Sequence, residues 1–280
     1  MAAGPGGSPP TLGVIGTGGA LLALAPGRSA SSEPLHLIVL DPAGANSTEL
    51  VESPGVSVVA SVDELADLSD VILVSAEPED AVAALETLAP CLGKEGVVAV
   101  SAAGVTLELL REALGPGPAL LRVVLGPAVP AAGLVVLCPE PGISEEALER
   151  AARLLGRLGV VETITEDHLE AAGAVASASV GFLALALDGL EDGAVNAGLP
   201  RDVARVFVRQ TLLATALLLG AQAGSPADLK DQVASPGGTT IAGLAVLEDM
   251  GVRGAFLRAA EAAVTRAYEE QDAQPSHVIE

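Results

Sequence analysis

The segment Leu12–Ala20, which reads LGVIGTGGA, carries the strongest fold signal in this 280-residue chain. Its first four residues are typical of a buried strand, and a Gly-x-Gly turn follows at Gly16 and Gly18. In a dinucleotide-binding fold the first glycine permits a tight bend, and the second lets the backbone approach a pyrophosphate. We therefore predict that a dinucleotide cofactor is bound by Gly16, Thr17, Gly18, Gly19 and Ala20.

A second strand is predicted at Leu35–Leu40, and Asp41 and Pro42 follow it directly. In dinucleotide-binding folds an acid at this place accepts hydrogen bonds from the adenosine ribose. A carboxylate would repel a 2′-phosphate, so Asp41 favours NAD over NADP, whereas an aspartate before a proline is also typical of a simple turn. The sequence leaves both NAD and NADP open as the cofactor.

Short β-branched segments alternate with helical patterns as far as residue 165. Strands are predicted at Thr11–Ile15, Leu35–Leu40, Val56–Val59, Val71–Val74, Gly96–Ser101, Leu120–Leu125, Leu134–Leu137 and Val160–Ile164. Helical spacing occurs at Val62–Ala66, Glu79–Ala89, Thr106–Leu114 and Glu145–Leu158. This alternation predicts an α/β fold with a parallel sheet covered on both faces.

The pattern changes after Thr165 to long helices rich in alanine and leucine, predicted at Glu166–Ala197, Arg201–Ala223 and Gly254–Glu270, with shorter helices ending at Val233 and Glu248. We predict a flexible tail over 1–10, a Rossmann-type dinucleotide-binding domain over 11–165, an all-α dimerisation and substrate domain over 166–270, and a second tail over 271–280. Helices that are apolar on more than one face are usually packed in a larger assembly. We therefore expect a homodimer or higher homo-oligomer through the second domain.

Composition excludes several classes of partner. The net charge is −22, with 36 acids against 14 bases, so nucleic acid and anionic lipid are not expected to bind. The three histidines are scattered without metal-ligand spacing, and we predict no metal site. The apolar segments Gly181–Leu187 and Leu212–Ala223 fall short of the ~20 residues of a membrane span, so buried helices and a cytoplasmic protein are expected.

A second glycine-rich turn lies in the segment Ala234–Leu244, which reads ASPGGTTIAGL. The free amides at the start of the helix that follows attract anions, and glycines let a ligand approach them closely. The two threonine hydroxyls can both donate and accept hydrogen bonds. A small carboxylate or phosphate fits this segment, and the alternative is a glycine-rich turn with threonine as an ordinary helix cap.

Several motifs match one known family. The most specific is Leu229–Glu248 with its SPGGTTI core, and further matches occur at Ser101–Val105, Asp192–Val195, Gly198–Pro200, Gln210–Leu212 and Arg258–Arg266. On these residues the chain resembles the pyrroline-5-carboxylate reductases of proline biosynthesis. The match is highly specific in the C-terminal motif and diffuse in the N-terminal half.

The resemblance implies hydride transfer from NADPH or NADH to the imine carbon of 1-pyrroline-5-carboxylate, which gives L-proline. It implies that Thr240 is catalytic and hydrogen-bonds or protonates the ring nitrogen. The implied substrate-binding residues are Glu166, Gln232, Ser235, Gly237, Gly238, Thr239 and Thr240. Beside the cofactor, the resemblance adds Ala76, Glu77 and Ala103.

Two alternative functions are also considered for this sequence. A relative that has lost the cofactor site could act as an assembly or regulatory protein. It is favoured by Glu77 in place of a family lysine, by Leu21 at the third position of the glycine motif, and by the short segment Leu125–Pro127. A different two-domain reductase, such as a hydroxyacid dehydrogenase, needs a lysine on the long interdomain helix, and Glu166–Ala197 contains none.

Overall fold

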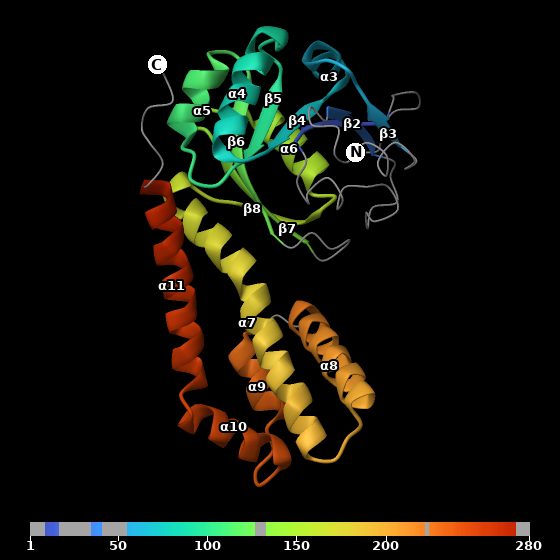
Figure 1. Cartoon of the computed structure of the whole chain (residues 1–280), viewed down its shortest axis with the longest axis vertical. Coiled ribbons are helices and arrows are strands. Elements are labelled where there is room, and N and C mark those ends of the chain that lie inside the picture. The colour runs from blue at the N-terminus through green and yellow to red at the C-terminus, as the bar shows by residue number, and fades with distance from the viewer. Residues whose placement is uncertain (1–8, 17–34, 41–54, 127–132, 222–223, 273–280) are drawn as a thin grey trace. The chain divides into compact units, whose positions relative to one another are not determined.

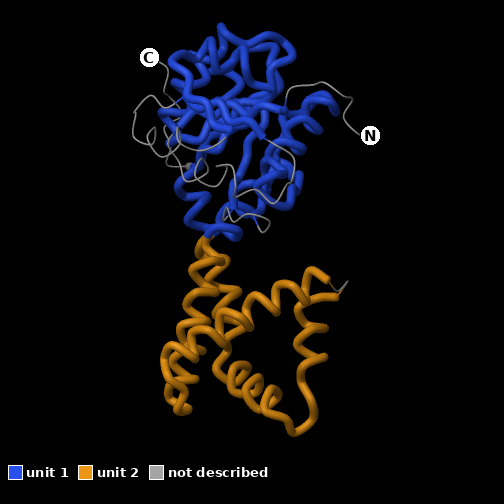
Figure 2. The backbone as a smooth tube through the Cα atoms, turned by 90° about the vertical axis from the view of Figure 1, so that its right-hand side faces the viewer, with its two compact units in different colours: residues 1–177, 264–280 blue, residues 178–263 orange. Residues whose placement is uncertain are grey.

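The computed structural model describes residues 9–16, 35–40, 55–126, 133–221 and 224–272. They divide into two compact units, Met1–Ser177 with Val264–Glu280, and Ala178–Ala263 (Figure 2). The first unit is built on a β-sheet covered by helices, and the second is helical. This confirms the predicted fold class, an α/β Rossmann-type part followed by an all-α part, while the predicted boundary after residue 165 stays a prediction.

The sheet contains β1 Thr11–Ile15, β2 His36–Leu40, β3 Val56–Val58, β4 Val71–Ser75, β5 Val97–Ser101, β6 Ala119–Leu125, β7 Gly133–Pro139 and β8 Gly159–Thr163. Within the described residues these strands lie in the order β3-β2-β1-β4-β5-β6-β7-β8 (Figure 1). The chain runs outward from β1 to β3 and then returns to place β4 on the other side of β1. In open α/β sheets, ligands bind at the carboxyl ends of the strands beside such a reversal.

One strand pair differs from the predicted parallel sheet. Strands β6 and β7 are antiparallel, with Leu121 opposite Pro139 and Leu125 opposite Val135. Only residues 126–132 join them, and a parallel pair needs a crossover of about a dozen residues or more. The prediction of a wholly parallel sheet was therefore wrong at this pair, because two strands follow one another here without room for a crossover helix.

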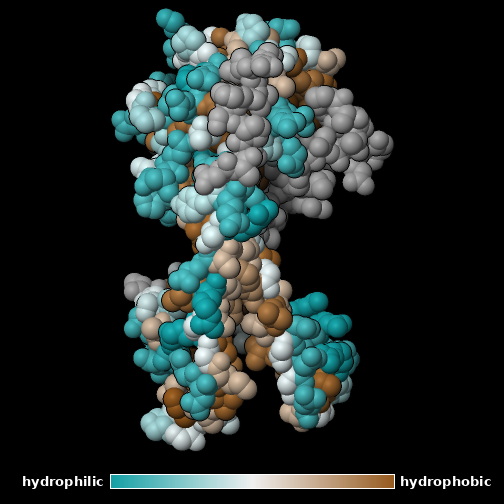
Figure 3. All heavy atoms as spheres, turned by 60° about the vertical axis from the view of Figure 1, so that its left-hand side comes forward, coloured by the Kyte–Doolittle hydropathy of each residue, from teal (hydrophilic) through white to brown (hydrophobic). Residues whose placement is uncertain are grey.

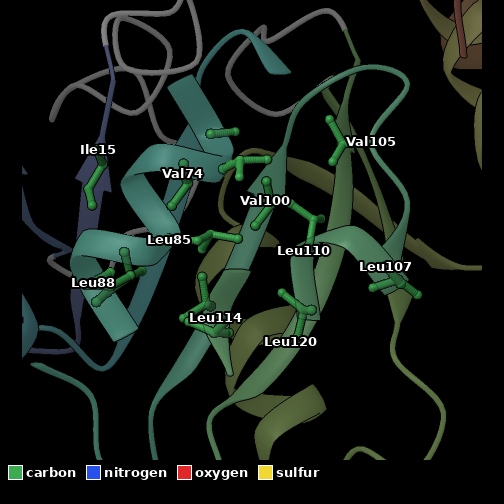
Figure 4. Packing of buried hydrophobic residues seen from close by; sticks show 14 of the residues in the cluster. Ile15, Val74, Leu85, Leu88, Val100, Val105, Leu107, Leu110, Leu114 and Leu120 are labelled. Atoms are coloured by element: carbon green, nitrogen blue, oxygen red, sulfur yellow. The ribbon is translucent and has the colours of Figure 1, made fainter. Parts of the chain in front are cut away.

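The described helices of the first unit are α3 Val62–Leu68, α4 Pro78–Leu88, α5 Leu107–Leu114 and α6 Glu145–Leu155, with short 3-10 turns at Ala89–Cys91 and Glu166–His168. Alternate strand residues enter two buried clusters, one on each face of the sheet. Leu73 packs in the cluster that contains Leu154 of α6. Its neighbour Ile72 belongs to the opposite cluster with Leu85 of α4 and Leu110 of α5, part of which Figure 4 shows.

Hydroxyl side chains fix where three of these helices begin. Ser61, Thr106 and Ser144 accept hydrogen bonds from backbone N–H groups three residues onward, at 3.2, 3.3 and 3.2 Å. Each bond satisfies one of the free amides of a helix start. Helix α4 differs, because Pro78 is at its start and no side chain caps it.

The remaining helices are α7 Leu169–Asn196, α8 Arg201–Ala221, α9 Pro226–Val233, α10 Thr239–Asp249 and α11 Val252–Asp272. Apolar side chains of α7 and α8 are exposed in this single chain, among them Leu185 at 75%, Leu217 at 64% and Phe207 at 58% (Figure 3). We predicted buried helices here, and that prediction was wrong for the chain taken alone. By length and composition, two helices of the described part, 166–196 and Arg201–Ala221, could cross a membrane.

Gly16 brings the end of β1 against the end of β4. Its φ is +122°, and a Cβ atom added there would lie 1.9 Å from the backbone oxygen of Ser75. Backbone cannot yield at that distance as a flexible side chain could, so the close approach of the two strand ends requires glycine.

We predict that Gly16→Ala destabilises the protein, by about 1–3 kcal/mol from the backbone conformation alone, with the clash at Ser75 in addition. The free energy of unfolding in urea measures the effect. Gly93→Ala is the matched control, because nothing lies within 4 Å of the Cβ position at Gly93. Equal stability of the two variants would contradict the argument.

Candidate active site

A cavity of about 890 Å³ lies at the carboxyl ends of β1, β4 and β5. It therefore occupies the place beside β1 and β4 where the strand order reverses. Its described walls are Ile15, Gly16 and Leu40, then Ala60, Ser61 and Val62 before α3, then Ser75, Ala76, Glu77, Asp80, Ala83, Ala84 and Thr87 around α4, and Ser101. A cavity of this size and position suits a dinucleotide.

The structure brings together three of the predicted cofactor residues. Gly16, Ala76 and Glu77 all line the cavity. Ala103 lies in an exposed turn after β5 and is not among the lining residues. The other predicted cofactor residues, Thr17, Gly18, Gly19, Ala20, Asp41 and Pro42, lie outside the described residues.

Sequence reasoning missed several polar residues of this cavity. Ser75 and Ser101 are the last residues of β4 and β5 and pair with each other across the two parallel strands. Asp80 and Thr87 reach the cavity from α4. Their positions could have identified them. In this kind of fold, ligands bind at the carboxyl ends of the central strands, where the last residue of each strand and the start of the next helix lie.

The start of α4 gives the cavity an anion-binding element. The amides of Glu79 and Asp80 lie in its first turn, where a helix offers no acceptor within itself, and no side chain caps this end. Such free amides favour a phosphate group. The cavity's described lining carries two acids, Glu77 and Asp80, and no lysine, arginine or histidine.

The predicted substrate residues form a second group, at the junction of α9 and α10. Gly237 has a φ of +68°, and the Gly238 N–H donates to the carbonyl oxygen of Ser235 at 3.0 Å. The positive φ of Gly237 is the feature of this turn that favours glycine, because side chains rarely adopt that backbone conformation. Gln232, Thr239 and Thr240 lie beside it and are exposed.

Gly238, and not threonine, is the N-cap of α10. No side chain caps this helix start, and the first amide bound within the helix is that of Ala242, which donates to the Gly238 carbonyl at 3.3 Å. The alternative that threonine caps the helix was therefore wrong. The free amides of the first turn and the exposed hydroxyls of Thr239 and Thr240 present hydrogen-bond donors to solvent, which suits a carboxylate with an adjacent ring nitrogen.

Glu166 belongs to an ion cluster of the first unit that is built around the buried Arg122. Arg122 of β6, whose side chain is 3% exposed, donates to Glu166 Oε1 at 3.1 Å and to Glu170 Oε1 at 2.6 Å. The same Oε1 of Glu166 accepts the Leu107 N–H at the start of α5, at 2.6 Å. Burial, with the nearby Glu166 charge, raises the pKa of the Cys138 thiol to about 11.

This cluster binds the start of α7 to the sheet and to α5. At the other end of the helical segment, the Tyr268 hydroxyl of α11 donates to the carbonyl oxygen of Asp167 at 3.1 Å. Glu166 thus has an anchoring role that the sequence did not reveal. Its substrate-binding role stays a prediction, because Glu166 lies in the first unit and the glycine-threonine turn in the second.

Two family models match the chain. Residues 166–270 match the model described as pyrroline-5-carboxylate reductase dimerisation, and residues 11–104 match the model described as NADP oxidoreductase, coenzyme F420-dependent. Together they include both groups of candidate residues described above.

Curated relatives and solved structures agree with these matches. The chain is 35% identical over 237 residues to pyrroline-5-carboxylate reductase of Synechocystis, covering 84% of this chain and 88% of that enzyme. It is 32% identical over 260 residues to the enzyme of that name from Pisum sativum, covering 92% and 95%. A solved pyrroline-5-carboxylate reductase from Coxiella burnetii superposes with a TM-score of 0.83 at 26% identity, covering 92% and 97%.

We predict that Arg122→Met destabilises the protein by about 1–3 kcal/mol, because it leaves the Glu170 carboxylate, 12% exposed, and the Glu166 carboxylate, 35% exposed, without their buried partner. Arg266→Met is the matched control. Arg266 also pairs with two glutamates, but its side chain is 68% exposed and such pairs contribute about 0–1 kcal/mol. Urea unfolding of both variants checks the difference, and similar losses in the two would contradict the assigned anchoring role.

Proposed function

The chain belongs to the pyrroline-5-carboxylate reductase family, and we infer that it reduces 1-pyrroline-5-carboxylate to L-proline. When bound, NADPH or NADH supplies a hydride to the imine carbon, and the ring nitrogen gains or keeps a proton. The chain is therefore an NAD(P)H-dependent oxidoreductase that acts on a CH–NH group in proline biosynthesis. The observation that carries this function is the 35% identity over 84% of the chain.

The alternative of an assembly or regulatory protein without catalysis receives no support from the relatives. Those reported above are all pyrroline-5-carboxylate reductases by name. Glu77 was one reason to consider that alternative, and it lines a cavity large enough for a dinucleotide.

We propose that the turn before α10 binds the substrate carboxylate. The hydrogen-bond donors of this turn support the proposal. The uncapped backbone amides at the start of α10 and the Thr239 hydroxyl can both donate to a small anion. Thr240 follows directly and donates a hydrogen bond to the ring nitrogen, which holds the imine for attack at its carbon. Gln232, Ser235, Gly237 and Gly238 complete this binding segment, and Glu166 is proposed to lie beside the substrate.

The cofactor is proposed to occupy the cavity at the ends of β1, β4 and β5. Gly16 allows its close approach to the backbone, the start of α4 faces its phosphates, and Ala76 and Glu77 line its other wall. These features fit a dinucleotide, because each supplies space or amide donors. Ala103 is proposed to lie near this site from the turn after β5.

The chain forms a homo-oligomer, and we propose that the exposed apolar side chains of α7 and α8 lie at the interface between its copies. The match of residues 166–270 to the dimerisation model includes both helices. Burial between copies accounts for Leu185, Phe207 and Leu217 without a membrane. We propose a cytoplasmic protein that binds neither membrane nor nucleic acid, consistent with its charge of −22.

We predict that Thr240→Val lowers kcat/KM for 1-pyrroline-5-carboxylate by about 100-fold, because a methyl group cannot donate to the ring nitrogen. Thr240→Ser is expected to keep most of the activity. Thr215→Val is the control, since Thr215 is in the same helical part and its hydroxyl donates to the Thr211 carbonyl oxygen of its own helix, at 2.8 Å. The turnover of all three variants is measured from the absorbance of the reduced cofactor. Unchanged turnover in Thr240→Val would exclude the assigned role.

We predict that Leu185→Glu separates the copies, because it places a charge in the proposed interface. Light scattering after size-exclusion chromatography measures the molar mass, which should fall to that of one chain. Leu68→Glu is the control, since Leu68 of α3 is 47% exposed and lies in the other unit. A wild-type chain that is monomeric, or that requires detergent to stay in solution, contradicts the proposal.

A further inference from the structure

We propose that Glu166 is a positioning residue for the reduction, an inference that rests on the proposed function. Through the amide of Leu107 it fixes the turn of residues 102–106, which leads from β5 into α5. The turn begins directly after Ser101, a residue that lines the cofactor cavity. This role of Glu166 in hydride transfer needs no contact with the substrate.

The turn lies on the side of the cavity that suits the nicotinamide half of the cofactor. A Rossmann sheet consists of two mononucleotide-binding halves that meet where the strand order reverses, which here is between β1 and β4. The half that contains β1 and β2 binds the adenosine ribose. Strands β4 and β5 belong to the other half, so the turn after β5 is placed beside the nicotinamide ring.

This turn is held at both ends and has little freedom between them. At its start, Ser101 pairs with Ser75 in the sheet. Within it, Gly104 is buried with a φ of +73°, and Val105 is 1% exposed and packs in the same buried cluster as Leu107 (Figure 4). A displacement of Leu107 therefore passes into the turn, because only five residues separate it from Ser101.

Glu166 holds the start of α5 from outside the helix. Its Oε1 accepts the Leu107 N–H at 2.6 Å, whereas the Thr106 hydroxyl caps a different amide, that of Leu109, at 3.3 Å. Arg122, whose side chain is 3% exposed, donates to the same Oε1 at 3.1 Å. Hydrogen bonds to a carboxylate are shorter and stronger than those between neutral groups. The sheet thus fixes the carboxylate, and the carboxylate fixes the first amide of α5.

Steady-state kinetics of the purified full chain test this role. Glu166→Ala removes the bond to Leu107, and kcat is expected to fall about tenfold or more, because a small misplacement of a bound reactant slows its reaction strongly. The KM for 1-pyrroline-5-carboxylate is expected to stay close to that of the wild type. Glu170→Ala is the matched control. Glu170 pairs with the same Arg122 at 2.6 Å, but among the described residues it makes no hydrogen bond to α5, so kcat should be retained.

Two further variants separate positioning from a loss of stability. Glu166→Gln keeps an acceptor oxygen for the Leu107 N–H, so it is expected to restore most of the kcat that Glu166→Ala loses. Leu107→Pro removes the N–H itself, and proline is tolerated at the first residue of a helix. It should lower kcat as Glu166→Ala does, with no further loss in the double variant. Leu107→Val trims the side chain but keeps the N–H, and so controls for packing.

Unchanged kcat in both Glu166→Ala and Leu107→Pro overturns the inference and leaves the proposed function standing. A raised KM for 1-pyrroline-5-carboxylate in Glu166→Ala, without rescue by glutamine, would assign Glu166 to substrate contact and also overturn it. A wild-type chain that forms no proline overturns both the inference and the proposed function. Circular dichroism confirms that each variant is folded, and if Glu166→Ala is not, Leu107→Pro against Leu107→Val makes the same comparison.

Discussion

The guanidinium of Arg122 is buried in the sheet, and the arrangement of the helices around it depends on how its charge is neutralised. Glu166 and Glu170 supply two carboxylates from the start of the helical segment. Because an unpaired buried charge costs several kcal/mol, the first turn of α7 must stay on β6 for the fold to be stable. Glu166 extends this link to the first amide of α5, which follows the turn after Ser101, a residue that lines the cavity at the ends of β1, β4 and β5.

The two candidate sites share one structural feature. Each contains a helix start whose free backbone amides are not capped by a side chain. In our proposal the start of α4 binds the phosphates of a dinucleotide, and the start of α10 binds the carboxylate of a small imino acid. Glycine is required at Gly16 by the close approach of the Ser75 backbone and favoured at Gly237 by a positive φ. Hydride transfer to an imine needs little more than an anion site, a donor and correct positioning.

Local patterns were enough to predict the two-part fold and the approximate positions of all eight strands, β1 to β8. Local patterns failed where a feature depends on a residue or segment far away in the sequence, or on a second copy of the chain. The antiparallel pairing of β6 and β7 follows from the short connection between them. The prediction of a parallel sheet from alternating strands and helices did not take that connection into account. Arg122 and Glu166 are 44 residues apart and carry no shared motif. Leu185 and Leu217 are exposed in the single chain, and their proposed burial requires a second copy.

The central claim is that this chain transfers a hydride to the imine carbon of 1-pyrroline-5-carboxylate. The most direct measurement uses NADH that carries two deuterium atoms at C4 of its nicotinamide ring, followed by mass spectrometry of the product. The account predicts L-proline with one deuterium on the ring carbon that was the imine carbon. Proline without deuterium, or cofactor bound with no proline formed, would contradict it.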